Sequence, residues 1–166
     1  MKNTGKQRLS SYWDRFGTFT ILVLLILMLA LFGPPQFIAP SNLLQIAIQS
    51  SITIIIACGE FFAILIAGID LSVGSIMALA GMVTAKLVAM GSVPWEIAVL
   101  TGLLVGAMCG IFNGMLINVT GLHPFVVTLG TQSIFRGLVL IFSDAKSVYG
   151  FPQQFKDFMG GWLGGR

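Results

Sequence analysis

Charged residues are scarce in this chain, and their scarcity excludes most classes of protein. Only 9% of the 166 residues are charged, whereas soluble domains average roughly 25%. Hydrophobic residues make up 56%, and the mean hydropathy is +0.94. No charged residue lies between Arg15 and Glu60, or between Glu96 and Arg136. A membrane span needs about 20 mostly apolar residues. The sequence therefore predicts a polytopic membrane protein and excludes a soluble enzyme, a nucleic-acid-binding module and a secreted disulfide scaffold.

Cysteine, histidine and catalytic motifs are also rare or missing. Cys58 and Cys109 lie inside apolar runs, where we expect buried small side chains rather than a disulfide or a metal site. The single histidine, His123, lies in a short break and is expected to be a turn residue rather than a metal ligand or proton relay. The sequence contains no GxSxG, no HExxH and no nucleotide-binding glycine loop. We therefore predict no catalytic residue, no metal, no cofactor and no enzyme activity.

Five apolar segments predict an all-α polytopic membrane fold with about five transmembrane or partly re-entrant helices. Short breaks rich in glycine or proline separate several of them, and a short interfacial helix follows. The fifth segment is interrupted by polar residues and by Arg136-Gly137, so it is either a full span or a partly re-entrant one. We treat the chain as one transmembrane domain, 1–166, with spans at about 16–32, 42–67, 73–90, 95–119 and 125–142.

The basic residues predict the orientation. Lys2, Lys6, Arg8 and Arg15 precede the first apolar run, as expected of a flank retained in the cytoplasm. A secretory signal peptide is the alternative, but the apolar run is long and no small-x-small cleavage pattern follows it. We predict an uncleaved first helix with a cytoplasmic N-terminus, which places the tail outside after five crossings.

Six polar or ionisable residues are candidates for a translocation pathway or for structural roles at membrane depth. Lipid cannot satisfy such groups, so they are expected to face other helices or water. Weak polar lining suits a neutral polyol better than an ion, because low-affinity walls allow rapid release. The candidates are Glu60, Asp70, Ser72, Asn113, Gln132 and Arg136.

Several of these candidates have a structural alternative. Glu60 is either a protonated carboxyl bonded between helices or a pathway residue. Asp70 or Ser72 caps the helix that follows the Gly68–Ser72 break, in preference to binding substrate. Arg136 is expected to be a structural lock on Asp70 or on helix-end carbonyls rather than a pathway residue, because a mid-span arginine must meet a partner or a water-filled cavity.

Two further patterns predict packing and surface features. Glycines recur at four-residue spacing in the fourth segment and lie on one helix face, which permits close helix packing. These are Gly102, Gly106, Gly110 and Gly114. In the tail, aromatic residues recur at helical spacing opposite Lys156 and Asp157, which predicts an interfacial helix. They are Phe151, Phe155, Phe158 and Trp162.

Three stretches carry a family resemblance. The most specific is ACGEFFAILIAGIDLSVGSIMALAGMV, at residues 57–83. GAMCGIFNGMLINVT at 106–120 and PFVVTLGTQSIFRGL at 124–138 agree in order and spacing. Together these stretches resemble the permease subunits of bacterial ABC sugar importers, in the ribose/xylose/allose/galactose branch. The similarity covers most of residues 40 to 145.

The resemblance implies a membrane component that hydrolyses nothing itself. Such permeases pair as homodimers among the lipids of the inner membrane and receive a monosaccharide from a periplasmic sugar-binding protein. A cytoplasmic ATP-binding subunit drives transport. The tail is then periplasmic, and its aromatic residues form a rim near the docking site of the binding protein.

Two departures from the family pattern qualify the resemblance. Glu60 stands where an uncharged residue is expected. This difference either marks a sub-branch of the family or contributes to substrate choice. We favour the sub-branch of allose-type importers. The chain is about half as long as family permeases, so it is expected to be an N-terminal half. The alternatives are a proton-coupled secondary transporter or channel that uses Glu60 and Arg136, and a truncated scaffold that does not transport.

Overall fold

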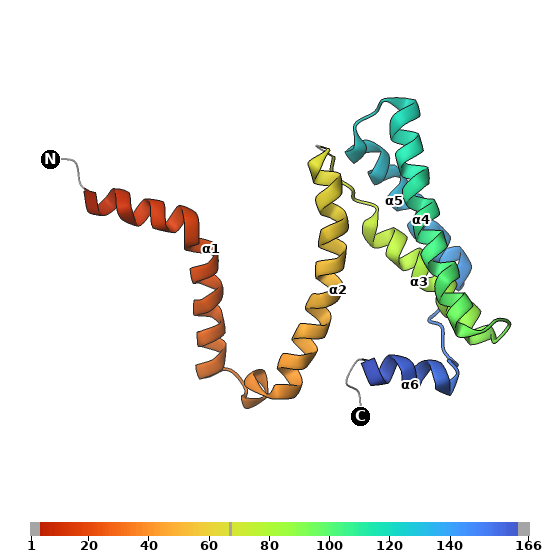
Figure 1. Ribbon diagram of the computed structural model, residues 1–166, viewed down its shortest axis with the longest axis horizontal. Coiled ribbons are helices and arrows are strands. Elements are labelled where there is room, and N and C mark those ends of the chain that lie inside the picture. The colour runs from red at the N-terminus through yellow and green to blue at the C-terminus, as the bar shows by residue number, and fades with distance from the viewer. Residues whose placement is uncertain (1–3, 67, 163–166) are drawn as a thin grey trace. The chain divides into compact units, whose positions relative to one another are not determined.

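The computed structural model is helical throughout its described part (Figure 1). It describes the backbone of residues 4–66 and 68–162 and the side chains of residues 13–66 and 68–160. Five helices are long and apolar enough to cross a membrane, which confirms the predicted fold class. The elements are α1 Thr4–Phe32, a 3-10 turn η1 Pro35–Ile38, α2 Pro40–Leu65, α3 Val73–Met90, α4 Trp95–Thr120, α5 Pro124–Ser143 and α6 Gln153–Trp162.

The chain divides into two compact units, residues 1–49 and 50–166. In the first unit, α1 begins well before the predicted start at Phe16, because no proline or other breaker interrupts the polar segment that precedes the apolar run. Its apolar part, Trp13–Phe32, is the candidate span. The basic side chains of Lys2, Lys6 and Arg8 lie outside the described residues.

The boundaries of the helices follow local backbone chemistry. Gly91 and Gly121 adopt the left-handed conformation, with φ of 61° and 64°, and end α3 and α4. Pro124 starts α5, where a missing N–H costs nothing. His123 Nδ1 accepts a hydrogen bond from the Phe125 amide at 3.3 Å, so the histidine is an N-cap in the turn where the sequence predicted a turn residue.

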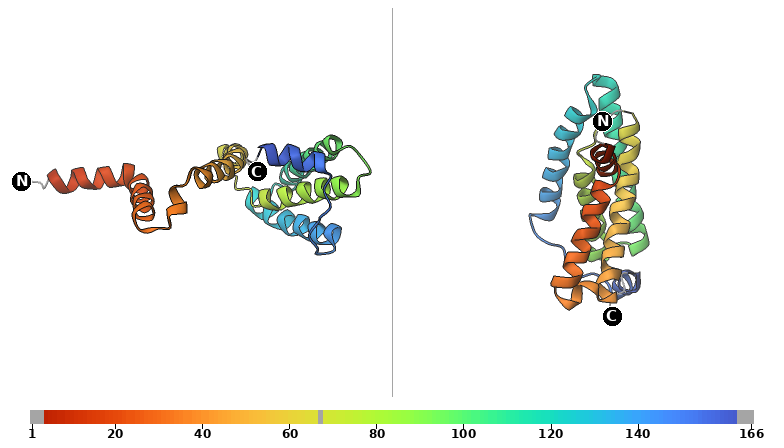
Figure 2. Two further views of the ribbon diagram at one scale, coloured as in Figure 1. Left: turned by 90° about the horizontal axis from the view of Figure 1, so that it is seen from below. Right: turned by 90° about the vertical axis from the view of Figure 1, so that its left-hand side faces the viewer.

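In the second unit, α3, α4 and α5 pack together (Figures 1 and 2). Helix α4 runs antiparallel to α3, since Gly102 faces Thr84 while Asn113 bonds to Ser72. Helix α5 runs parallel to α3, so that both begin at the same end of the bundle. The apolar core of this bundle consists of Leu79, Cys109, Phe135 and Val139.

The two cysteines differ in environment. Cys109 is buried in this core, as expected. Cys58 is exposed on α2, so the prediction that it is buried is wrong for this structure. The physical reason is that α2 buries none of the side chains in its span, and apolar side chains on such a helix suit contact with lipid.

The four glycines of α4 have different surroundings. A Cβ on Gly102 would collide with Thr84 Oγ1 and lie 3.0 Å from the Ala80 carbonyl oxygen, so α3 and α4 approach closely there. A Cβ on Gly106 would make only ordinary contacts, with its two nearest atoms at 3.9 Å. A Cβ on Gly110 or Gly114 would have no neighbour within 4 Å among the described residues.

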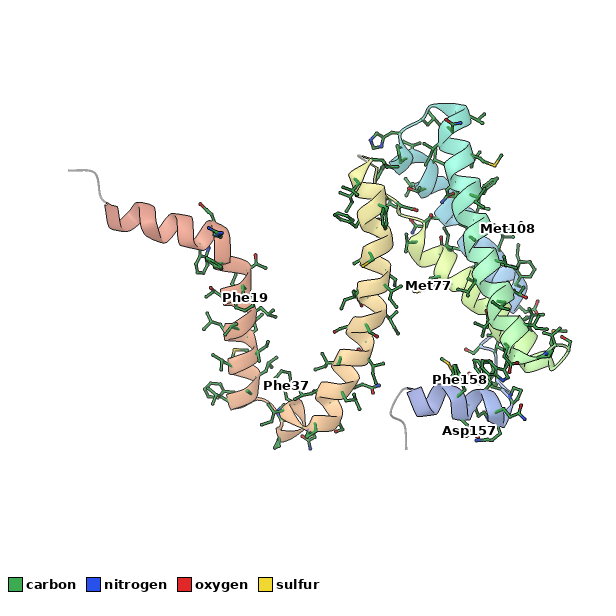
Figure 3. All side chains as sticks on the ribbon, viewed as in Figure 1. Phe19, Phe37, Met77, Met108, Asp157 and Phe158 are labelled. Atoms are coloured by element: carbon green, nitrogen blue, oxygen red, sulfur yellow. The ribbon has the colours of Figure 1, made fainter. Side chains whose placement is uncertain are left out.

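The last two helices resolve questions that the sequence left open. Helix α5 runs from Pro124 to Ser143 without a break, so the polar residues do not interrupt it. Helix α6 begins after Phe151, and Phe155 and Phe158 stack on Trp95 with ring centroids 6.0 and 4.7 Å away. Phe158 and Asp157 lie on opposite sides of α6 (Figure 3). The side chain of Trp162 lies outside the described residues.

Candidate functional site

The break between α2 and α3 packs against the start of α5. The Gly68 amide donates to the Ala63 carbonyl at 2.9 Å, which closes the end of α2. A Cβ on Gly68 would lie 3.3 Å from the Pro124 ring and 3.2 Å from the Ala63 oxygen. A larger residue would therefore push the connector away from α5, and glycine allows the two segments to meet.

Thr128 of α5 holds the connector by a hydrogen bond on each side. Its hydroxyl oxygen accepts from the Leu71 amide at 3.1 Å, and the hydroxyl lies 3.2 Å from the Ile69 carbonyl, to which it donates. Thr128 is 2% exposed, and its hydrogen bonds to these irregular backbone groups are partly buried. Such groups at membrane depth need a partner within the protein.

A chain of hydrogen bonds then links the connector to α4. Asp70 Oδ1 accepts from the Ser72 amide at 2.7 Å and from the Ser72 hydroxyl at 2.6 Å. Asn113 Nδ2 donates to Ser72 Oγ at 2.7 Å. Ser72 and Asn113 are 0% and 4% exposed, whereas Asp70 is partly exposed, so this polar chain is buried at its Asn113 end.

The capping role differs from the sequence expectation. Ser72 occupies the N-cap position of α3, but its side chain makes no capping hydrogen bond. Instead, the Ser72 carbonyl accepts the amides of Ser75 and Ile76, each at 2.9 Å. Asp70 accepts the Ser72 amide in a local turn before the helix, because a short carboxylate side chain reaches the amide two residues on.

The chemistry of the carboxylate orients the whole chain. An ionised carboxylate only accepts, so the Ser72 hydroxyl proton is directed to Asp70, and Asn113 presents its NH₂ group to Ser72. The carbonyl oxygen of Asn113, Oδ1, is buried without a hydrogen-bond partner among the described residues. Burying an unpaired acceptor costs about 1–3 kcal/mol, so a donor at this point would stabilise the folded protein.

A cavity of about 300 Å³ lies beside this cluster, between the start of α3 and α5. It is lined by Leu71, Gly74, Ser75, Gln132 and Arg136. Gln132 and Arg136 are one helical turn apart and therefore share a face of α5. Helical side chains lean towards the helix N-terminus, which directs Arg136 back towards Gln132 and the start of α3.

Arg136 does not form the expected lock on Asp70. Across residues 13–66 and 68–160, no carboxylate pairs with its guanidinium, which lines the cavity instead. Asp70 Oδ1 instead accepts both donors of Ser72, which lies two residues further along the chain. Arg136 is exposed at the edge of this cavity.

The structure brings five of the six polar candidates into two adjoining groups, formed by the connector before α3 and by α4 and α5. Asp70, Ser72 and Asn113 form the hydrogen-bonded chain, and Gln132 lines the cavity with Arg136. Glu60 is half-buried on α2 and belongs to neither group. In the described part of the chain, no three histidine, cysteine or acidic side chains are close enough to hold a metal ion.

Two residues of this site were missed by sequence reasoning. Thr128 bridges the connector, and Ser75 lines the cavity while its hydroxyl donates to the Ser72 carbonyl at 2.7 Å. Both are hydroxyl residues in the first two turns of a helix: Ser75 in α3, which follows the break, and Thr128 in α5, which packs against it. Their position near a helix start is the feature of the sequence that could have identified them, because the backbone N–H and C=O groups of a break need partners from adjacent helices.

Comparisons with known proteins place most of the chain in one family. Residues 42–163 match the family described as "Branched-chain amino acid transport system / permease component". The D-allose transport system permease protein AlsC of Escherichia coli is 54% identical over 89% of this chain and 45% of its own length. The ribose import permease protein RbsC of Haemophilus influenzae is 34% identical over 89% and 46%.

A third relative covers almost the whole chain. The galactose/methyl galactoside import permease protein MglC of Escherichia coli is 32% identical over 98% of this chain and 52% of its own length. The chain thus spans about half the length of the curated relatives that it matches. No solved structure matches it. Five helices that can span a membrane and a family match over residues 42–163 lead to one conclusion: this multi-pass membrane protein belongs to the branched-chain amino acid transport system permease family.

Proposed function

We propose that this chain forms part of the translocation pathway of a binding-protein-dependent ABC importer for a monosaccharide. The observation that carries the proposal is the 54% identity to a D-allose permease over 89% of this chain. The ribose and galactose permeases are 34% and 32% identical, which favours an allose-type sugar. The relatives, rather than the broad description of the family, indicate the substrate class.

The same resemblance supports the proposed partners. A cytoplasmic ATP-binding subunit supplies the energy for transport, and a periplasmic binding protein delivers the sugar. The permease acts as a homodimer in the inner membrane. The scarcity of charge on the described helices is compatible with contact with lipid over most of their surface. The chain itself performs no covalent chemistry in this scheme.

The proposed orientation places the N-terminus in the cytoplasm. Five crossings then put α6 on the periplasmic side, together with the loop between α3 and α4. The contacts of Phe155 and Phe158 with Trp95 support a common side for α6 and this loop. The half-exposed Phe158 makes this end a candidate rim for the binding protein.

Roles for the six polar residues follow from their surroundings. We assign Asp70, Ser72 and Asn113 to holding the connector between α2 and α3, because they bond to one another. Gln132 and Arg136 are assigned to the pathway, because they line the cavity. Glu60 remains a candidate for substrate choice through α2.

The test is uptake of labelled D-allose by cells that lack their own allose permease but contain the ATP-binding subunit and the binding protein. One strain expresses this chain, and another expresses a chimaera in which the chain replaces the matching part of the D-allose permease. We expect the chain or the chimaera to restore uptake that requires both other subunits. Uptake should collapse on depletion of ATP and survive a protonophore under conditions that preserve ATP.

The controls separate the alternatives. Omitting the binding protein or the ATP-binding subunit should return uptake to that of empty vector, and D-allose should exceed D-ribose and D-galactose. Uptake that follows the proton gradient and survives loss of ATP would identify a secondary transporter. If neither protein restores any uptake while both reach the membrane, the proposed function is wrong.

A further inference from the structure

The cavity between α3 and α5 carries polar groups that no local contact explains. Gln132 and Arg136 line it; both are exposed, and neither has a hydrogen-bond partner among the described residues. Leu71 and Gly74 supply the apolar part of the wall. A cationic side chain on a membrane helix is costly unless a polar environment receives it. A polar ligand in the cavity would supply that environment to Arg136, and the lining of the cavity defines which ligand fits there.

The lining combines donors and acceptors. The Ser75 hydroxyl proton is committed to the Ser72 carbonyl at 2.7 Å, so Ser75 Oγ offers only lone pairs to the cavity. Gln132 offers both an acceptor and donors, and Arg136 offers only donors. A ligand with hydroxyl groups matches this set, because each hydroxyl donates one hydrogen bond and accepts others.

The same inventory argues against ions. An anion would accept from Arg136 but leave Ser75 Oγ and the Gln132 carbonyl without donors. A cation would be repelled by Arg136, and no carboxylate lines the cavity. The volume of about 300 Å³ lies at the lower end of the range of small-molecule pockets, about 300–1,000 Å³, which suits one monosaccharide better than a longer saccharide.

We propose that this cavity is a low-affinity subsite for a neutral monosaccharide within the permease, with Ser75, Gln132 and Arg136 as the groups that recognise its hydroxyls. This proposal rests on the proposed transport function and deepens it. The subsite gives the membrane component a sugar preference of its own, in addition to that of a binding protein. Its affinity is weak, since tight binding would slow release.

The experiment measures binding directly on the 166-residue chain, reconstituted in lipid nanodiscs without partner proteins. The melting temperature is followed by tryptophan fluorescence during titration with D-allose, D-ribose or inorganic phosphate. A ligand that binds only the folded state raises the melting temperature with concentration. We expect D-allose to do so at millimolar concentration and phosphate to have no effect.

Variants then locate the site. Arg136→Gln should raise the dissociation constant for D-allose by about tenfold or more, since a hydrogen bond to a charged group contributes about 1.5–3 kcal/mol. Gln132→Leu should raise it by up to about tenfold, since a hydrogen bond between neutral groups contributes about 0.5–1.5 kcal/mol. Lys86→Gln removes the same charge from α3, and Ser133→Ala changes a neighbouring α5 hydroxyl that bonds within its own helix. Both controls should bind D-allose like the wild type. If Arg136→Gln does not fold, Arg136→Lys, which keeps the charge, takes its place in the binding measurement.

The outcomes separate this inference from the proposed function. No sugar-dependent shift in the wild type, or equal binding by all folded variants, would overturn the subsite. A shift with phosphate instead of sugar would overturn the neutral-ligand assignment. The uptake experiment decides the transport function independently, because a permease without its own subsite still restores uptake.

Discussion

At the scale of single residues, the hydroxyl of Thr128 holds the connector between α2 and α3 by hydrogen bonds. Thr128 accepts the Leu71 amide and donates to the Ile69 carbonyl, which replaces the partners that a helix would otherwise supply. Thr131, one turn later, is equally buried but bonds only to the Thr128 carbonyl of its own helix. The pair therefore distinguishes a hydroxyl that joins two segments from one that does not.

We expect Thr128→Val to destabilise the protein by about 1–3 kcal/mol, because the substitution keeps the shape but leaves a buried amide unpaired. Thr128→Ser keeps the hydroxyl and should retain most of the stability. The measurement is the free energy of unfolding in mixed micelles with increasing SDS. Thr131→Val is the matched control and should cost less than Thr128→Val. Equal losses for the two valine variants would contradict the bridging role.

At the scale of helices, the closeness of α3 and α4 depends on a single glycine more than on the four-glycine pattern. Gly102 is buried against Thr84 and the Ala80 carbonyl, whereas Gly110 has open space around its Cα. The pattern of glycines identifies a helix face able to pack closely. Which glycine meets a neighbour depends on where the two helices cross.

We expect Gly102→Ala to lower stability by about 1–3 kcal/mol, because the added methyl group forces α3 and α4 apart. Gly110→Ala should leave stability unchanged or raise it by up to about 1 kcal/mol, since alanine is the better helix former. The unfolding free energies of the two variants, measured in the same micelles, give the comparison. A destabilised Gly110→Ala together with a neutral Gly102→Ala would contradict the packing described here.

At the scale of the whole molecule, the antiparallel order of α3, α4 and α5 constrains the topology. The loop between α3 and α4 and the loop between α4 and α5 lie at opposite ends of the bundle (Figure 2). With a cytoplasmic N-terminus, the first of these loops is periplasmic. The charges of the loops differ little between the two sides, so the prediction of this orientation depends on the basic residues that precede the apolar part of α1.

Labelling of single cysteines tests that orientation. In a background with Cys58→Ala and Cys109→Ala, we expect Ser92→Cys to react with a membrane-impermeant maleimide in intact spheroplasts. Leu122→Cys should react only after the membrane is opened, because its loop is cytoplasmic in the proposed orientation. The two positions serve as each other's control for reactivity and expression. The reverse pattern would show that the N-terminus is outside.

The sequence by itself determined the class of protein and the positions of its helices. Runs of apolar residues without charge permit few structures other than membrane helices, and glycine and proline end helices for local reasons. The signature around Gly68–Ser72 carried the family resemblance, which the match over residues 42–163 confirms. It also pointed to Asp70, Ser72, Asn113, Gln132 and Arg136 as the polar residues of interest.

Only the tertiary structure decided how these polar residues are paired. Arg136 lines a cavity and does not pair with Asp70, and Thr128 bonds to the connector. Ser75 of α3 lines the same cavity as Gln132 and Arg136 of α5. Periodicity places a residue on a face of its own helix, but the rotation and crossing of helices determine which face meets which neighbour. In the interior of this bundle, hydrogen bonding then selects the partners, because buried polar groups are costly until they are paired.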